Sequence, residues 1–138
     1  MDNILRFLGI AKKAGKLALG EEPVGFATKT RTCFLILIAK DAAENTMRRA
    51  SRLSQAENVL FLILPYTKEE LGQATGRSSL AILAFTDIGL AKAIVKKLFA
   101  FYGTSTYREA VTILEERSTH FIQQRQTEQR VSKKKRYK

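Results

Sequence analysis

The sequence predicts an α/β fold: a three-layer α/β/α sandwich around a small, mostly parallel mixed sheet, with a C-terminal helical and basic extension. Short, continuous apolar runs alternate with segments of helical periodicity, which is the pattern of strands joined by helices. Each run is continuously apolar and has no alternating polar positions. This is typical of strands covered on both faces. With 138 residues and 45% hydrophobic content, the chain is long enough for one core and short for two ordinary domains.

The first helix is expected over residues 3–14, where Gly15 and the lysines before it form a basic end and a stop. Its apolar residues fall on one helical face: Ile4, Leu5, Phe7, Leu8 and Ala11. A short segment over 17–19 then reaches Gly20. A second helix is expected from Glu21 to about Thr30, because carboxylates and a proline suit the first turn of a helix.

The middle of the chain repeats one strand and one helix three times. The run CFLILIA over 33–39 predicts a central strand, and 43–54 predicts a helix after it. The run VLFLIL over 59–64 predicts another buried strand, after which Thr67 and Glu70 form a capping box and Gly76 ends the helix. A third apolar strand over 80–85 leads to Asp87, which opens a helix through Phe101.

The composition changes after Gly103, which divides the chain into a domain over 1–103 and an extension over 104–138. Apolar residues keep helical spacing from Tyr107 to Ile122, so a helix there can dock on the domain or on a partner. Beyond Val131 the chain is mainly lysine and arginine. We expect this end to be a disordered basic tail that can lie along phosphates.

The chain is strongly basic. Lys and Arg number 24 against 13 Asp and Glu, a formal net charge of +11. Such a charge attracts polyanions, with nucleic acid first and an anionic membrane surface second. The extension holds nine Lys and Arg and four Asp and Glu, which leaves +6 for the domain. A basic domain that carries a basic tail fits RNA.

The sequence shows no apolar run of transmembrane length and no secretory signal, so we expect a soluble, cytoplasmic protein without membrane contact. Cys33, the single cysteine, heads an apolar run and is expected to pack in the core. It has no cysteine partner for a disulfide or a zinc site. We therefore expect no metal and no cofactor.

No motif in the sequence indicates catalysis, and we expect no catalytic residues and no enzyme. The only histidine, His120, lies in the extension without a carboxylate or cysteine cluster near it in sequence. Glu21, Glu22 and Asp87 are the remaining candidates for acid and base chemistry. Carboxylates at helix starts more often serve the helix dipole or its cap, and we interpret them in that way.

Basic groups gather at the ends of predicted elements. If the strands are parallel, the loops after their C-terminal ends lie along one rim and can meet one ligand together. The alternative is a set of scattered, solvated lysines. The residues in question are Lys12, Lys13 and Lys16 around Gly15, Lys40 after the central strand, Tyr66 and Lys68 after the next strand, and Arg77 after Gly76.

Four segments occur in a recognisable order: AKKAGKLALGEE, LILIAKDAAENT, LPYTKEELGQATG and LAILAFTD. In these segments the chain resembles the kink-turn-binding ribosomal protein superfamily, and it looks most similar to the small bacterial relatives of the ribosomal members. The resemblance covers residues 3–101. It implies an α/β/α sandwich that holds RNA kink-turns or related internal loops within ribosomes or other ribonucleoproteins, and it implies no reaction.

The resemblance also implies where RNA would bind. In the family, an Asn-Glu pair and a later Lys at the start of the second helix meet sheared G·A pairs; here these positions fall on Glu22, Pro23 and Phe26. A second RNA element is the loop after the fourth helix. With the basic loop residues, the expected RNA-binding set is Lys12, Lys13, Lys16, Gly20, Glu21, Glu22, Lys40, Tyr66, Lys68, Arg77, Ser78 and Ser79.

The resulting hypothesis is a non-catalytic RNA-binding protein associated with the ribosome. Its RNA is expected to be ribosomal, with the rim on a structured loop, a kink-turn or a related form, and the tail on neighbouring phosphates. The alternative is a protein-interaction adaptor of the same fold with non-specific RNA affinity only. That adaptor would use the helix over 107–122 to bind its partner.

Overall fold

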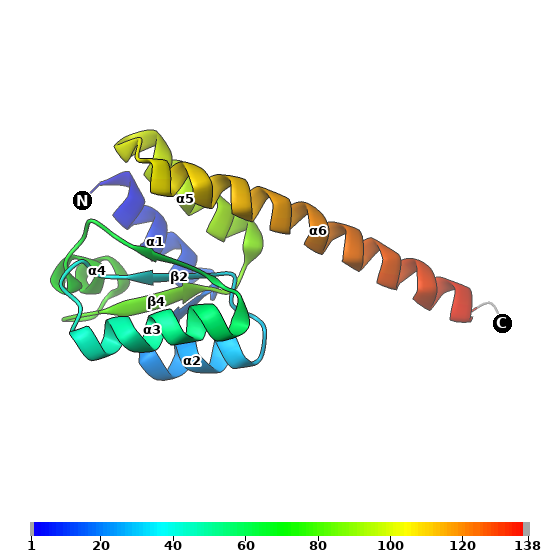
Figure 1. Ribbon diagram of the computed structural model, residues 1–138, viewed down its shortest axis with the longest axis horizontal. Coiled ribbons are helices and arrows are strands. Elements are labelled where there is room, and N and C mark those ends of the chain that lie inside the picture. Colours follow the sequence, from blue (N-terminus) through cyan, green and yellow to red (C-terminus); the bar gives the residue numbers. More distant parts are fainter. Residues whose placement is uncertain (1, 137–138) are drawn as a thin grey trace.

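The computed structural model describes residues 2–136, and the side chains up to residue 129. It is a three-layer α/β/α sandwich (Figure 1), as the sequence predicts, with α1 and α5 above the sheet and α2 and α3 below it. In chain order the elements are α1 (Asn3–Lys13), β1 (Leu17–Leu19), α2 (Glu21–Lys29), β2 (Leu35–Ile38), α3 (Glu44–Glu57), β3 (Leu60–Ile63), α4 (Lys68–Thr75), β4 (Ile82–Phe85), α5 (Ile88–Tyr102) and α6 (Ser105–Arg136).

The four strands lie in the order β1-β4-β2-β3. β2 and β3 form a parallel pair, whereas β4 runs antiparallel to both of its neighbours, β1 and β2. Three strands therefore point in one direction and β4 in the other, so the sheet is mixed, as predicted, but only one of its three neighbouring pairs is parallel. The reason is α4, which has eight residues and does not cross the sheet. The N–H of Leu80 donates to the carbonyl of Lys68 at 2.9 Å, so the chain enters β4 at the edge where it left β3.

Strand burial follows position in the sheet. All four residues of β2 and of β4 are buried, which confirms the central strand expected over 33–39. The run over 59–64 was expected to be covered on both faces, but β3 is the edge strand and Ile63 is 50% exposed. Apolar runs in the sequence do not distinguish a central strand from an edge strand when helices pack on both faces.

The helix boundaries agree with the local signals in the sequence. The side-chain carboxylates of Asp2 and Asp87 accept from backbone N–H groups at the starts of α1 and α5. Thr67 and Glu70 form the predicted capping box of α4, and Gly76 ends that helix in the left-handed conformation, with φ +78°. Such caps satisfy N–H and C=O groups that a helix end leaves without partners.

Helix α6 is continuous over 32 residues, or about 48 Å at the rise of an α-helix. Its first half packs beside α5, and its second half projects beyond the sandwich (Figure 1). Tyr107, Ala110 and Leu114 are buried members of the main core cluster. The face expected to dock on the domain or on a partner therefore docks on the domain.

The predicted disordered tail, beyond Val131, lies outside the residues whose side chains the structure describes, and its contacts remain a prediction. Its backbone continues α6 as far as Arg136 and is helical there. In residues 2–136, no helix combines the length and the apolar character that a membrane crossing requires.

Candidate nucleic-acid interface

One edge of the sheet collects most of the predicted binding residues. β1, β2 and β3 end at this edge and β4 begins there, since Leu19 pairs with Leu83, and Ile82 pairs with Ile38. The edge therefore carries Gly20 after β1, Lys40 after β2, and the 77–79 loop before β4. β1 and β2 are two strand spacings apart, or about 10 Å, which a single RNA loop can span. We call this edge the rim.

The start of α2 and the loop after α4 are in contact at one end of the rim. A Cβ built on Gly20 would lie 3.7 Å from a guanidinium nitrogen of Arg77. Gly20 has φ +98°, in the region that favours glycine, and no side chain caps α2. Helix N–H groups without a capping side chain are suited to bind phosphate oxygens. A guanidinium group and backbone N–H donors therefore lie close together here, and we call this place the Gly20–Arg77 corner.

The two glutamates at the start of α2 are in different environments. Glu21 accepts from Arg49 of α3 at 2.9 Å, and the ion pair offsets its negative charge beside the backbone donors. Glu22 is exposed and has no ion-pair or hydrogen-bond partner among the described side chains. A carboxylate in this position can accept hydrogen bonds from the N–H groups of a base.

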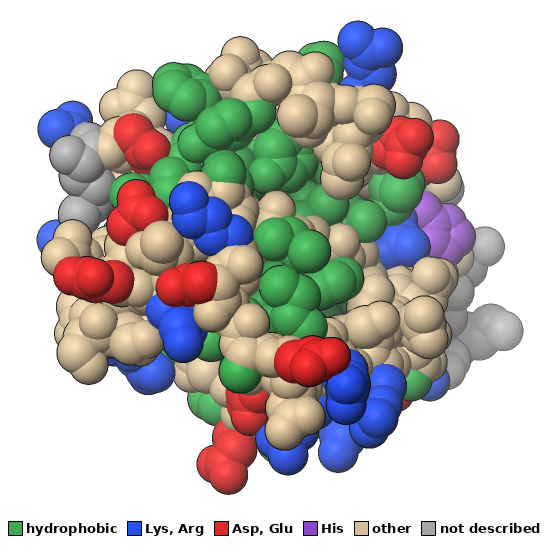
Figure 2. All heavy atoms as spheres, turned by 60° about the vertical axis from the view of Figure 1, so that its left-hand side comes forward, with side chains coloured by type: hydrophobic (Ala, Val, Ile, Leu, Met, Phe, Trp, Pro, Cys, Tyr) green, Lys and Arg blue, Asp and Glu red, His purple; other side chains and the backbone are tan. Residues whose placement is uncertain are grey.

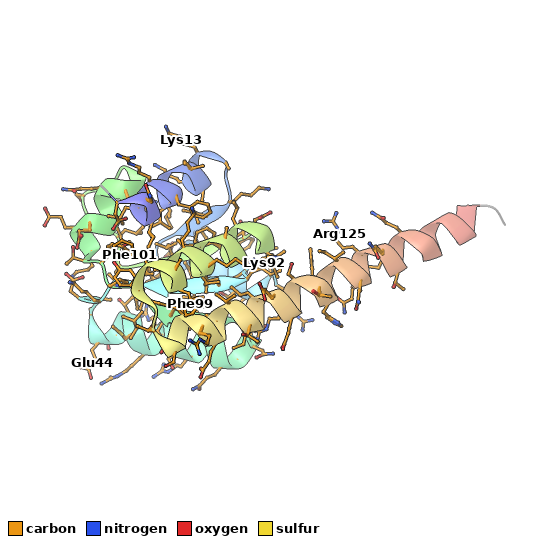
Figure 3. All side chains as sticks on the ribbon, turned by 90° about the horizontal axis from the view of Figure 1, so that it is seen from above. Lys13, Glu44, Lys92, Phe99, Phe101 and Arg125 are labelled. Carbon is orange, nitrogen blue, oxygen red and sulfur yellow. The ribbon has the colours of Figure 1, made fainter. Side chains whose placement is uncertain are left out.

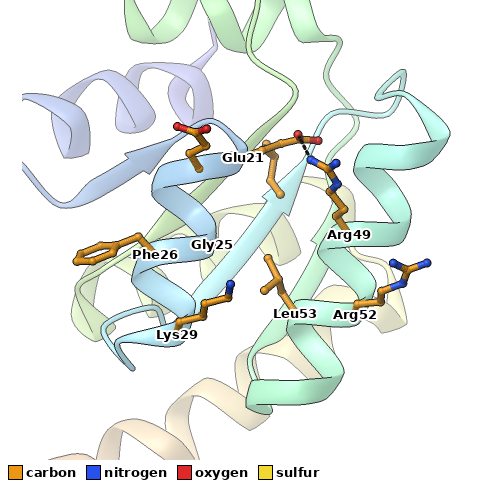
Figure 4. A pocket seen from close by; sticks show the side chains of 9 residues that line it. Glu21, Gly25, Phe26, Lys29, Arg49, Arg52 and Leu53 are labelled. Carbon is orange, nitrogen blue, oxygen red and sulfur yellow. Dashed lines mark hydrogen bonds and ion pairs between the residues drawn. The ribbon is translucent and has the colours of Figure 1, made fainter.

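A groove of about 550 Å³ runs between α2 and α3, below the rim (Figure 4). Gly25 and Leu53 contribute to its apolar lining, and Arg49 and Arg52 come from the α3 side. Phe26 is 72% exposed at the margin of the groove and points away from α3. Neither arginine belongs to the expected binding set, although their spacing of three residues in the sequence places both on one side of α3.

The 77–79 loop is held closely against α4. A Cβ on Gly72 would lie 2.7 Å from the carbonyl oxygen of Arg77 and from the amide nitrogen of Ser79. The N–H of Arg77 donates to the carbonyl of Gly72 at 2.7 Å. Ser78 and Ser79 are exposed. The glycine therefore allows the close approach that positions this loop beside Gly20.

Tyr66 was expected on the rim surface, but it belongs to the core. It is 3% exposed, and its hydroxyl group donates to a carboxylate oxygen of Asp2 at 2.8 Å. The Tyr102 hydroxyl lies 3.3 Å away. Burial and these two neighbours raise the pKa of Tyr66 far above its usual value. The backbone carbonyl of Tyr66 also accepts from Lys40, so the residue supports the rim from beneath.

The three lysines around Gly15 do not act as one cluster. Lys12 donates to the carbonyl of Thr75 at 2.5 Å, which places its charge at the C-terminal end of α4, where the helix dipole favours a cation. The carbonyl of Lys16 accepts from Thr86 at the opposite edge of the sheet from Gly20. Lys13 and Lys16 are exposed, and Lys16 lies away from the rim.

The remaining part of the rim has mixed charge. Lys40 is exposed, and Lys68 is partly exposed at the start of α4. The N–H of Lys68 donates to Asp41 at 2.8 Å, and Glu69 follows in the first turn. The two lysines thus have carboxylates near them in the chain, and these carboxylates weaken the attraction of the lysines for phosphate.

Two other features of the surface are distinct from the rim. Figure 2 shows hydrophobic side chains on the side of the molecule that lies at the left in Figure 1, where α5 turns into α6; Phe101, which closes α5, is 69% exposed. His120 on α6 lies 3.0 Å from the side chain of Gln124. No group of three or more potential metal-ligating side chains was found in the part of the chain that the structure describes.

The fold and the rim together define a small α/β/α protein whose exposed loops offer backbone donors, a guanidinium and a carboxylate at one sheet edge. No model of a known protein family matches the chain. Its sequence is similar to "RNA-binding protein YlxQ" of Bacillus subtilis (strain 168), with 28% identity over 95 residues, 66% of this chain and 90% of that protein.

The fold is also found in a solved structure. A protein of unknown function from Bacillus halodurans C matches with a TM-score of 0.65 and 22% identity, over 70% of this chain and 96% of that one. At this identity the likeness concerns the fold alone.

Proposed function

We propose that this protein is a non-catalytic RNA-binding protein that recognises a structured RNA loop, a kink-turn or a related internal loop, through the Gly20–Arg77 corner of the rim. The observation that carries the proposal is the similarity to a protein named as RNA-binding, which extends over 90% of that relative. The net charge of +11 agrees with a polyanionic partner.

The rim offers two kinds of contact. Arg77 and the free N–H groups at the start of α2 suit phosphate oxygens, and such contacts position RNA without selecting its sequence. Glu22 suits the N–H donors of guanine, which are exposed where bases form sheared pairs rather than Watson–Crick pairs. Selectivity for the loop therefore depends on Glu22, and general affinity depends on Arg77.

We further propose that the RNA is ribosomal and that the protein acts in association with the ribosome, in the cytoplasm. The adaptor alternative required the apolar face of the helix over 107–122 for a partner. Tyr107, Ala110 and Leu114 of that face are buried in the core of the same chain, and Ile122, at its far end, is 50% exposed. The burial of most of this face favours the RNA-binding hypothesis.

The test measures the binding of the full chain to two RNA hairpins of equal length. One has a kink-turn internal loop, and in the other Watson–Crick pairs replace the loop. We expect tighter binding to the loop RNA and about tenfold loss for Arg77→Gln on both RNAs, since a charge-assisted contact contributes about 1.5 kcal/mol. Glu22→Gln should reduce the preference for the loop and leave binding to the paired RNA unchanged. Equal affinity of the unmodified protein for the two RNAs would contradict the proposal.

A further inference from the structure

Most of the net positive charge of the sandwich comes from residues outside the rim. Residues 21–85, which include α2, α3 and α4 and most of the rim, hold eight Lys and Arg and seven Asp and Glu, a net charge of +1. Residues 2–20 and 86–103 hold seven Lys and Arg against Asp2 and Asp87, a net charge of +5. Almost all the excess charge of the sandwich therefore comes from α1, α5 and the adjoining turns.

These two segments lie on the same face of the sheet. Seen from above, α1 and α5 are side by side, with Lys13 near the end of one helix and Lys92 on the other (Figure 3). The N–H of Thr86 donates to the carbonyl of Lys16 at 3.0 Å, which joins the turn after α1 to the start of α5. The charges of both segments thus combine on one surface, which we call the α1–α5 face.

The two carboxylates of these segments are already engaged in the fold. Asp2 accepts from Leu5 and from the Tyr66 hydroxyl group, at 2.8 Å in each case. Asp87 accepts from Leu90 at 2.9 Å. Lys96 forms an ion pair with Glu115 of α6 at 3.2 Å. Arg6, Lys13, Lys16, Lys92 and Lys97 have no carboxylate at ion-pair distance among the described side chains.

Lys97 is held by an aromatic side chain and not by a counter-charge. Lys97 lies over the ring of Phe7, with its ammonium nitrogen 5.4 Å from the ring centroid. That ring stacks on Phe85 of the core at 6.3 Å. Like charges on one surface repel one another, and this repulsion is relieved when a polyanion binds. The arrangement is typical of a surface for phosphates.

We propose that the α1–α5 face is a second RNA-binding surface, which takes the backbone phosphates of a helical RNA segment next to the loop held at the rim. The inference rests on the proposed function. The two surfaces meet at the end of α1, where the ammonium of Lys12 lies beside Gly76 and the 77–79 loop follows. An RNA that leaves the rim at Arg77 can continue past Lys13 to the lysines of α5.

A membrane fits this face less well. A helix that binds a lipid surface inserts apolar side chains, but the apolar side of α1 is buried in the core. Ile10, 63% exposed, is the one large hydrophobic residue of these two helices, apart from Phe101 at the far end of α5, that is more than half exposed. A duplex needs cations and no inserted apolar side chains, and this face provides the cations.

The test compares two double variants of the full chain that lose the same charge. Lys92→Gln with Lys97→Gln removes two cations of the α1–α5 face. The matched control, Arg31→Gln with Arg48→Gln, removes two exposed cations from the α2 and α3 side. Affinity is measured against salt for loop RNAs with a short or a long flanking helix, for a plain duplex, and for vesicles of anionic lipid.

We expect the α5 variant to lower the slope of log K against log salt by about 1.8 on the long-helix RNA and on the plain duplex, at about 0.9 per phosphate. The control should change that slope by less than half as much, and the short-helix RNA should respond little to either variant. Equal slopes for the two variants would overturn the inference, as would a loss confined to the vesicles. Because the plain duplex has no loop, this result does not depend on loop selectivity, and the two proposals can fail separately.

Discussion

At the scale of single residues, Tyr66 shows how an aromatic residue in a loop can serve the core. It follows a strand directly, a place where sequence reasoning predicts surface contact, but its ring is buried and its hydroxyl group is tied to Asp2. Lys12 is similar, since its charge serves the end of α4. Both residues support the rim through the fold, and neither needs to touch RNA.

We therefore expect Tyr66→Phe to leave RNA affinity unchanged within about twofold, while it alters stability at alkaline pH. Burial raises the pKa values of Tyr66 and Tyr107 in the folded protein. The unfolded chain loses these protons near pH 10, before the folded protein does, so the free energy of unfolding falls as pH rises past about 10. As long as Tyr66 keeps its proton in the folded protein, it adds about 1.4 kcal/mol per pH unit to that slope. Urea unfolding between neutral pH and pH 11 measures it, and an unchanged slope in Tyr66→Phe would contradict the assignment.

At the scale of elements, α4 and its following loop determine the rim. α4 is short and stays at one edge of the sheet, and Gly72 lets the 77–79 loop approach it at van der Waals distance. The capping box fixes the start of this helix and is visible in the sequence. The close approach at Gly72 is not visible in the sequence, because it brings together a helix and a loop whose path depends on β4.

Two glycines within helices, one close to a neighbouring loop and one in open space, give a matched pair of substitutions. Gly72→Ala places a Cβ 2.7 Å from backbone atoms of Arg77 and Ser79, so we expect a loss of about 1 to 3 kcal/mol in stability and weaker RNA binding as the loop shifts. Gly25→Ala meets nothing within 4 Å and should stabilise α2 by about 1 kcal/mol through helix propensity. Thermal unfolding and hairpin binding measure both effects. A stable Gly72→Ala variant with normal binding would refute the role given to this approach.

At the scale of the whole molecule, the first half of α6 is part of the sandwich core. Tyr107 and Leu114 are buried against α5 and the sheet. Arg117 donates to the carbonyl of Asn58 at 3.0 Å, and Phe121 packs edge-on against Phe34 with 5.4 Å between ring centroids. The division of the chain at Gly103 remains a prediction about folding units. Residues of α6 as far as Phe121, however, contact residues that precede Gly103.

Two truncations test where the folding unit ends. Removal of residues 104–138 should abolish cooperative unfolding, because the loss of Tyr107 and Leu114 alone costs about 2 to 3 kcal/mol each, against a total stability of about 5 to 15 kcal/mol. Removal of 123–138 should preserve the cooperative transition and reduce RNA affinity at low salt, since this segment has seven Lys and Arg and one Glu. Calorimetry measures the cooperativity of unfolding, and an RNA titration measures the affinity. Cooperative unfolding of the 1–103 fragment near the full-length Tm would show instead that the sandwich folds without α6.

The sequence by itself determined the helices, three of the four strands, the caps of α4 and α5, the central position of β2 and the net charge. These properties depend on residues a few positions apart, on apolar periodicity and on composition. Only the tertiary structure decided that β4 runs antiparallel, that Tyr66 is buried and that Lys16 faces away from Gly20. It also decided that the lysines of α1 join those of α5. Strand direction and the sharing of a surface depend on where the chain re-enters the sheet, and this is a long-range property that local patterns do not contain.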